Sequence, residues 1–130
     1  MVLEMKATAK PTILKSKSLK PELKKALKSA LNPQSVMPIQ ESEINDFFNE
    51  TDCRAYRIKY SDAAFRDVKS IIKTKVRNKS KVLAILNGNQ NTTLDHLNSI
   101  WTSILNNVND VYWGYYLGGK ANNSLFLFVK

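Results

Sequence analysis

The chain holds few of the residues on which catalytic and metal sites are built. Its 130 residues include one cysteine, Cys53, and one histidine, His96. A single cysteine excludes an intrachain disulfide, and a single histidine excludes a metal site with two imidazole ligands. Only four glycines occur, and Gly118-Gly119-Lys120 lacks the spacing of a phosphate-binding loop. We therefore expect no enzymatic activity and no bound cofactor, metal or nucleotide.

The two candidate reactive side chains have ordinary structural interpretations. Asp95 and His96 are neighbours on an expected helix, where adjacent side chains diverge by about 100° and cannot form an acid–base pair. Cys53 follows an acidic segment, which raises the pKa of a thiol and disfavours a nucleophile. We interpret both as structural residues.

Long apolar segments are also missing. No stretch approaches the length of a membrane span, and the N-terminus lacks the apolar core of a secretory signal. We expect an intracellular protein, cytoplasmic by preference. Import into an organelle stays open, because the lysine-rich start resembles a presequence in composition.

Positive charge is abundant and concentrated in two segments. The net charge is +9. Residues 1–30 hold eight lysines against two glutamates, and residues 66–81 hold seven basic residues against one aspartate. Residues 41–52 carry five acids and no base, whereas residues 82–119 contain neither lysine nor arginine. Clustered lysine and arginine side chains favour contact with phosphates or another polyanion.

The first third of the chain is expected to be an appendage. Residues 1–41 are interpreted as a basic arm with a short helix that begins at Pro21 and a linker, and residues 42–130 as a single domain. Residues 1–17 show no sustained periodicity and predict no regular element. Ser42 is expected to cap a second short helix.

From Arg54 the pattern predicts strand, helix, strand, helix, strand, strand. Alternation predicts a strand over 54–60, and an apolar run predicts a buried strand over 81–86. Helical spacing predicts helices after Ser61 and after Thr92 or Thr93. Runs 111–117 and 124–129 are expected to pair as a hairpin. This β-α-β-α-β-β order predicts an α/β (α+β) fold, a two-layer sandwich whose mixed sheet carries both crossover helices on one face.

Such a sheet leaves its second face to be covered. Tyr112 and Tyr116 share one face of an expected strand, and three covers are open: stacked bases, a protein partner or the N-terminal helices. The last strand is either an assembly edge, with Phe126 and Phe128 at an interface, or a central strand buried on both faces.

The residues from Arg54 onward resemble the C-terminal domain of the tubulin homologue FtsZ. The resemblance is carried by Val82-Leu83-Ala84-Ile85-Leu86-Asn87-Gly88, the helix start Leu94-Asp95-His96-Leu97, and Val111-Tyr112-Trp113-Gly114. A division-ring partner domain of the SepF type is similar to the same degree. The GTP-binding half of the FtsZ family has no counterpart here, so the resemblance implies self-assembly without nucleotide hydrolysis.

The leading hypothesis is a non-enzymatic component of a nucleoprotein complex, which binds nucleic acid, RNA by preference, or another polyanion. The alternative is a protein-only polymer or scaffold that self-assembles through its sheet. The candidate nucleic-acid contacts are Lys6, Lys10, Lys15, Lys17, Lys20, Lys24, Lys25, Lys28, Lys69, Lys73, Lys75, Arg77, Lys79 and Lys81. Five of these residues are expected to form a ridge over a helix end and the following turn: Lys73, Lys75, Arg77, Lys79 and Lys81. The alternative is a solvated loop against which the acidic segment 41–52 packs.

Overall fold

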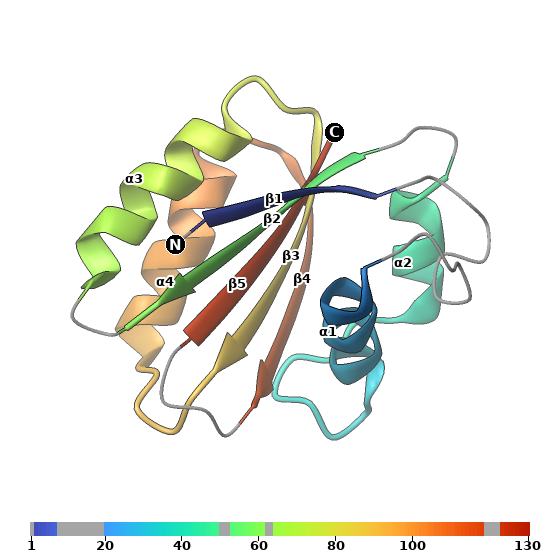
Figure 1. Cartoon of the computed structure of the whole chain (residues 1–130), viewed down its shortest axis with the longest axis horizontal. Coiled ribbons are helices and arrows are strands. Elements are labelled where there is room, and N and C mark those ends of the chain that lie inside the picture. Colours follow the sequence, from blue (N-terminus) through green and yellow to red (C-terminus); the bar gives the residue numbers. More distant parts are fainter. Residues whose placement is uncertain (1, 8–19, 50–52, 62–63, 119–122) are drawn as a thin grey trace.

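Five strands form one mixed sheet in the part of the chain that the structure describes (Figure 1). The structure is a computed structural model, and it describes residues 2–7, 20–49, 53–61, 64–118 and 123–130. The elements are β1 (Val2–Ala7), α1 (Pro21–Leu31), α2 (Glu41–Phe47), β2 (Cys53–Tyr60), α3 (Phe65–Val76), β3 (Lys81–Gly88), α4 (Leu94–Leu105), β4 (Asp110–Leu117) and β5 (Asn123–Val129). The strand order is β1-β2-β5-β3-β4.

The predicted element order from residue 54 onward is confirmed, and so is the α/β sandwich. The helix starts differ in detail. Thr93 caps α4 by accepting a hydrogen bond from the backbone N–H of His96 at 3.1 Å, as one of the two expected threonines. The start of α2 is Glu41 rather than the residue after Ser42, and there the Glu43 carboxylate accepts from the N–H of Gln40 at 3.0 Å.

The predicted hairpin between the last two strands is wrong, because β5 lies in the middle of the sheet. It pairs antiparallel with β2 on one side and with β3 on the other, while β4 pairs parallel with the far side of β3. All seven residues of β5 are buried. A strand that is apolar on both faces gains most where both faces are covered, so the central interpretation is confirmed and the edge interpretation is overturned.

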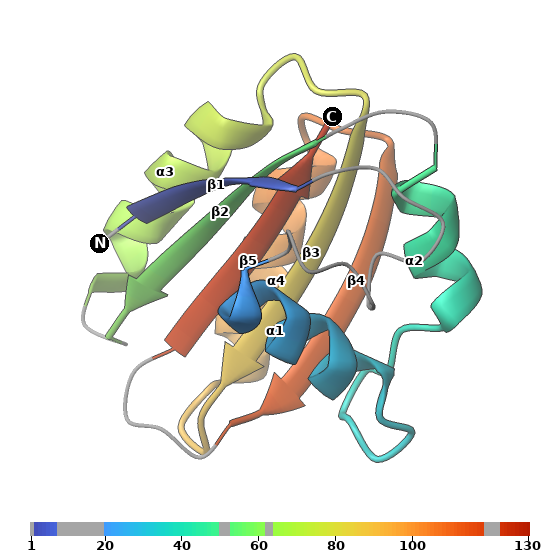
Figure 2. The ribbon, with the colours of Figure 1, turned by 45° about the vertical axis from the view of Figure 1, so that its right-hand side comes forward.

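Helices cover both faces of the sheet, which gives a third layer (Figure 2). On one face α3 and α4 bury Ile72 and Ile100 against β3 and β5. On the other face α1 and α2 bury Leu27 and Phe47 against Phe128. Of the three covers that the sequence left open, the N-terminal helices are the one present.

Helix α1 comes close to the sheet over a glycine. A Cβ atom built on Gly114 of β4 would lie 3.1 Å from the Cβ of Ala30 and 3.4 Å from Cγ1 of Ile85. Ala30 itself is fully buried. The pair Gly114 and Ala30 therefore sets how near α1 lies to β4, and any larger side chain at either position must push the helix away.

The first strand was not expected from the sequence. Val2–Ala7 pairs antiparallel with β2 and forms one edge of the sheet, where an arm without regular structure was predicted. The burial pattern of its first four residues explains the error: Met5 is buried, Val2 is half-buried, and Leu3 and Glu4 are exposed. An edge strand with so little apolar alternation carries almost no sequence signal.

The Gly114–Ala30 contact gives a prediction about stability. We expect Gly114→Ala to lower the free energy of unfolding by about 1–3 kcal/mol, because the added methyl group overpacks the α1–β4 contact. In the double variant Gly114→Ala/Ala30→Gly the helix regains the space. Urea unfolding of the two single variants and the double variant should therefore show a coupling energy of at least about 0.5 kcal/mol. Strictly additive effects would contradict a direct contact.

Candidate functional site

The outward face of α3 carries a row of basic side chains without acidic partners. Arg66, Lys69, Lys73 and Arg77 recur every three or four residues and are exposed. None of them forms an ion pair with a described residue. From the first to the last the row covers about 16 Å, at 1.5 Å per residue. We call these four residues the α3 basic row.

Apolar residues on the inner side of α3 fix the direction of this row. Val68, Ile72 and Val76 are buried against the sheet, at the spacing of one helix face. Lys75 lies toward this inner side: its ammonium is 4.7 Å from the ring centroid of Tyr56, and the side chain is half-buried. Lys75 therefore packs on an aromatic ring of β2 and is turned away from the row.

The single ridge expected from Lys73 to Lys81 does not form. Asn78 adopts a left-handed backbone conformation with φ of 61°, which reverses the chain between α3 and β3. Lys79, beyond this turn, is half-buried and lines a separate pocket together with Glu4 and Arg54. The end of α3 thus divides the alternating basic residues into two groups. Of the five expected ridge residues, only Lys73 and Arg77 stay on the outward face.

Lys81 forms ion pairs with two acidic side chains. Its ammonium lies 3.3 Å from the carboxylate of Asp46 and 3.7 Å from that of Asp110. The hydroxyl of Tyr112 also donates to Asp46, and this bond lowers the pKa of the Asp46 carboxyl and raises the pKa of Tyr112 to about 12. At Lys81 the acidic segment 41–52 therefore packs against a basic residue, as the alternative to the ridge expected.

The lysines of α1 lie on the opposite side of the sheet from α3 (Figure 2). Lys20, Lys25 and Lys28 are exposed and Lys24 is half-buried. Lys6 belongs to β1. The remaining candidates of the arm, Lys10, Lys15 and Lys17, lie outside the described residues. The structure thus separates the lysines of α1 from the α3 basic row by the thickness of the sheet.

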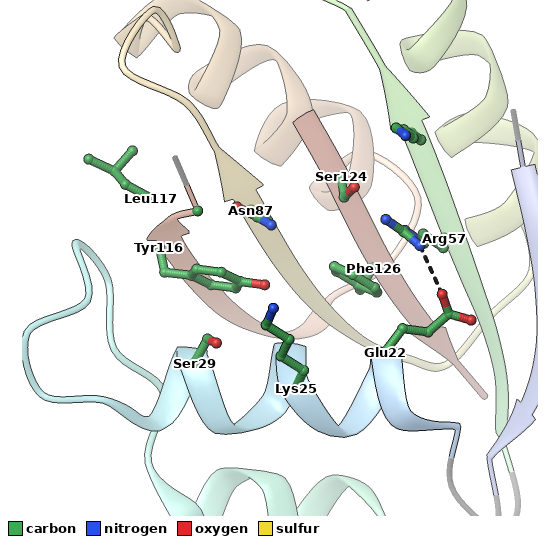
Figure 3. A pocket seen from close by; sticks show the side chains of 11 residues that line it. Glu22, Lys25, Ser29, Arg57, Asn87, Tyr116, Leu117, Ser124 and Phe126 are labelled. Atoms are coloured by element: carbon green, nitrogen blue, oxygen red, sulfur yellow. Dashed lines mark hydrogen bonds and ion pairs between the residues drawn. The ribbon is translucent and has the colours of Figure 1, made fainter. Parts of the chain in front are cut away.

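A pocket of about 550 Å³ opens between α1 and the end of the sheet (Figure 3). Glu22, Lys25 and Ser29 line it from one face of α1, and Arg57 and Lys59 line it from β2. The Nη1 atom of Arg57 donates to the Glu22 carboxylate at 2.8 Å. We call this cavity the α1 pocket.

The strands supply a row of polar side chains to the same pocket. Lys59 pairs with Ser124 of β5, Ser124 with Asn87 of β3, and Asn87 with Tyr116 of β4. Gly118 makes room for this row, because a Cβ atom there would lie 1.9 Å from Oδ1 of Asn87. Burial raises the pKa of Tyr116, against the lowering effects of the Ser29 hydroxyl and the Arg57 charge.

Sequence reasoning missed this pocket, although one signal was present. Arg57 and Lys59 alternate with buried aromatic and aliphatic residues of β2, and this alternation was interpreted only as a strand over 54–60. The structure instead covers that face with α1. The Nε atom of Arg57 is buried and has no hydrogen-bond partner in the described part of the chain, a state that costs about 1–3 kcal/mol.

The aromatic interface candidates are occupied inside the molecule. Phe128 packs edge-on against Phe48 at a centroid distance of 5.4 Å and is fully buried, and Phe126 is 4% exposed under the guanidinium of Arg57. Tyr112 is bonded to Asp46, and Tyr116 lines the α1 pocket. No sheet face in the described ranges is left open for base stacking, because helices lie on both.

The single histidine is half-buried and the single cysteine is buried. His96 stacks on Phe65 with ring centroids 4.2 Å apart, and Cys53 is buried at the start of β2. Across the residues that the structure places, no group of three or more metal-ligating side chains occurs. A search of those same residues finds no helix that combines the length and the apolar character of a membrane-crossing segment.

Comparison with known proteins gives structural likeness alone. No family model and no curated protein matches the chain. Among solved structures it is similar to the GDP-bound monomer of CetZ1 from Haloferax volcanii, with a TM-score of 0.48 and 12% identity over 70% of this chain and 32% of that chain. It is also similar to thiamine monophosphate kinase from Aquifex aeolicus, with a TM-score of 0.33 and 8% identity over 60% and 34% of the two chains.

The chain spans about a third of the length of each of these proteins. The likeness to CetZ1 is a weak resemblance to the tubulin and FtsZ family, at a level that carries no argument about function. The resemblance to a SepF-type domain stays a prediction.

The Tyr112–Asp46 bond predicts a pH dependence. The pKa of Tyr112 is raised from 10.0 to about 12, so the bond stabilises the fold fully below pH 10.0 and loses its contribution as the pH rises through about 12. Because the pKa of Asp46 is lowered from 3.8, the contribution is also lost as the pH falls below that value.

We expect the ring-carbon NMR titration of Tyr112 to have its midpoint near 12 and to return toward 10.0 in the Asp46→Asn variant. Tyr115 provides the internal comparison, since it lies on the other face of β4. An unchanged Tyr112 midpoint in Asp46→Asn would contradict the bond.

Proposed function

We propose that the chain is a non-enzymatic polyanion-binding protein, a component of a nucleoprotein assembly that contacts nucleic acid through the α3 basic row. The observation that carries this proposal is that four exposed cations share one helix face and none is neutralised by a described acid. The positive electrostatic potential of such a row is not cancelled by neighbouring acids and can attract an external polyanion. Phosphates that replace condensed counterions there give salt-dependent affinity.

The neighbouring helix supports the same proposal. A groove of about 350 Å³ lies beside Lys69 and is lined from α4 by Asn98, Ser99 and Thr102, with Asp95 as its one acid. Helices α3 and α4 lie side by side on the same face of the sheet (Figure 1). Uncharged polar side chains next to a basic row are the usual partners of phosphate and sugar oxygens. The contact surface that we propose therefore extends from the α3 basic row into this groove.

Substitution of the row tests the proposal. We expect Arg66→Gln/Lys73→Gln/Arg77→Gln to flatten the slope of log affinity against log salt by about 2 for a single-stranded RNA, at about 0.7 per neutralised phosphate. Fluorescence anisotropy with labelled RNA at several salt concentrations measures the slope. Lys69 stays in place because it lies over the ring of Phe65, 5.9 Å from its centroid.

The matched control is Lys20→Gln/Lys24→Gln/Lys28→Gln, which removes the same charge from α1 on the opposite face. A clearly smaller change of slope in this control supports a contact on α3. Equal changes in the two variants would show that net charge alone governs binding and would overturn the assignment. An affinity indifferent to salt would reject polyanion binding altogether.

The lysines of the arm require their own substitutions. Deletion of residues 1–20 would remove β1, whose six residues pair with β2, and would disturb the sheet as well as the charge. Lys10→Gln/Lys15→Gln/Lys17→Gln changes the charge alone. If the arm contributes contacts as proposed, the salt slope flattens by about a further 2 in the α3 variant background.

A second candidate function, a protein-only scaffold, now rests on β4 instead of β5. β4 is an edge strand, and in the described part of the chain its outer side is bridged at Tyr115 to Met37, through two hydrogen bonds of 3.0 Å. The backbone N–H and C=O groups of Val111 and Trp113 point to the same outer side as those of Tyr115, because these groups alternate in direction along a strand. Where no described residue pairs with it, an edge of this kind accepts a strand from another copy.

The edge can be tested without disturbing the sheet. Val111→Pro removes an N–H on the outer side of β4, so we expect it to convert a concentration-dependent oligomer into a folded monomer in sedimentation velocity. Tyr112→Pro removes an N–H toward β3 and serves as the control that should unfold the domain. A wild-type protein that stays monomeric at every concentration would reject the scaffold.

A further inference from the structure

We propose that the α1 pocket binds a small molecule that carries a phosphate group, at a site distinct from the α3 basic row. The pocket lies beside the carboxyl ends of β2, β3 and β4, between the sheet and α1 (Figure 3). In open α/β sheets this end is where ligands bind, because the strands stop there and the loops leave a crevice. The inference concerns a function beyond polyanion binding and does not depend on it.

Successive rows of side chains across one sheet face change in composition toward the pocket. The row that contains Phe128 and Leu83 is apolar apart from Tyr112, and the next contains Phe126 and Ile85 beside Arg57. The last row is polar in all four strands: Lys59, Ser124, Asn87 and Tyr116. The last row, at the pocket, is thus the one of these three rows in which every strand supplies a polar side chain.

Positive charge predominates in the lining of the α1 pocket. Three cations line the pocket, Lys25, Arg57 and Lys59, against one acid, Glu22. Glu22 is bonded to a single nitrogen of Arg57, which leaves this guanidinium with further donors, among them the unpartnered Nε. Lys25 forms no ion pair within the described ranges. Even without Lys59, the cations Lys25 and Arg57 outnumber the one acid of the lining, Glu22, so the lining carries a net positive charge and favours an anion.

Helix α1 and the strand ends hold these groups in place. Lys25 and Ser29 are four residues apart on α1 and point toward the strands, with the hydroxyl of Tyr116 opposite them (Figure 3). Ala30, one residue after Ser29, packs against Gly114 of β4 and so fixes the distance between α1 and the sheet. The donors that face the pocket thus come from a helix and from strand ends, and their spacing is fixed by packing.

The ligand class follows from the donors and the size. Ammonium, guanidinium, hydroxyl and amide groups all donate to phosphate oxygens, and charged donors make the strongest of these bonds. A volume of about 550 Å³ is several times that of a phosphate ion and falls in the range of small-molecule sites. We therefore infer a phosphate monoester whose organic part lies toward Tyr116 and the exposed Leu117.

Titration of the full chain with ribose 5-phosphate, followed by ¹⁵N-¹H NMR, tests the proposal. Inorganic phosphate serves as a second probe, and ribose as the uncharged control. We expect saturable shifts centred on residues 25–29, 57–59, 87 and 116–118 with both phosphates and none with ribose. Lys25→Gln and Lys59→Gln should each weaken binding by about tenfold or more, because each removes a charged donor.

Lys28→Gln is the matched control, since it removes the same charge from α1 at a position that does not line the pocket. It should leave the affinity for ribose 5-phosphate within about twofold, because exposed charges outside a site are screened. Equal losses in Lys25→Gln and Lys28→Gln, or no saturation with either phosphate, would overturn the site. The circular dichroism of each variant reports its folding, so a loss of binding in a folded variant is interpretable.

The two proposals fail separately. If RNA displaces ribose 5-phosphate and Lys25→Gln weakens RNA as much as the ester, the pocket belongs to the polyanion surface and the small-molecule site is rejected. If Arg66→Gln/Lys73→Gln/Arg77→Gln leaves ester binding unchanged while it flattens the RNA salt slope, both proposals stand. If the ester binds and RNA does not, the α1 pocket stands and polyanion binding falls.

Discussion

Burial of β5 on both faces is the constraint on which the rest of the structure depends. Its seven residues are all buried, between β2 on one side and β3 on the other. Phe126 and Phe128 face α1 and α2, whereas Leu125, Leu127 and Val129 face α3 and α4. A strand of this composition is stable only between two helical layers, because each exposed aromatic or aliphatic side chain would forfeit about 1.5–3 kcal/mol of burial.

The double cover explains the positions of the charges. The sheet and its two cores separate the α3 basic row from the lysines of α1, so no single flat surface can hold both. The molecule therefore presents two distinct cationic regions. One is a convex row on a helix, which fits an extended polyanion, and the other is a concave pocket under α1, which fits a compact anion.

Hydrogen bonds and ion pairs attach α2 to the edge of the sheet. Asp46 of α2 accepts from Tyr112 of β4 and pairs with Lys81 of β3, and Asp110 of β4 pairs with the same lysine. Lys81 was a candidate nucleic-acid contact, yet its ammonium group pairs with these two acids. An ion pair between partly exposed groups contributes little to stability by itself, but this arrangement removes Lys81 from the charge that an external partner meets.

Local pattern was sufficient for the helices and strands from residue 54 onward. The apolar spacing of α4 and the apolar run of β3 are strong signals, because both elements are buried along a whole face or on both faces. The α3 basic row was also predictable in part: Lys69, Lys73 and Arg77 were candidates, and Arg66 lies in the same charged segment. The sequence by itself therefore determined the element types from residue 54 onward, the sandwich class and the positive charge.

Tertiary structure decided which strands are neighbours and which charges stay free. The pairing of β5 with β2 and β3 joins residues more than 35 positions apart, and no local period records such a choice. β1 has one buried side chain in its described pattern, so its strand exists because β2 offers a free edge. The pocket residues Arg57, Asn87 and Ser124 meet only through this pairing. The sequence specified each side chain, but long-range pairing and helix packing specified which of them share a site.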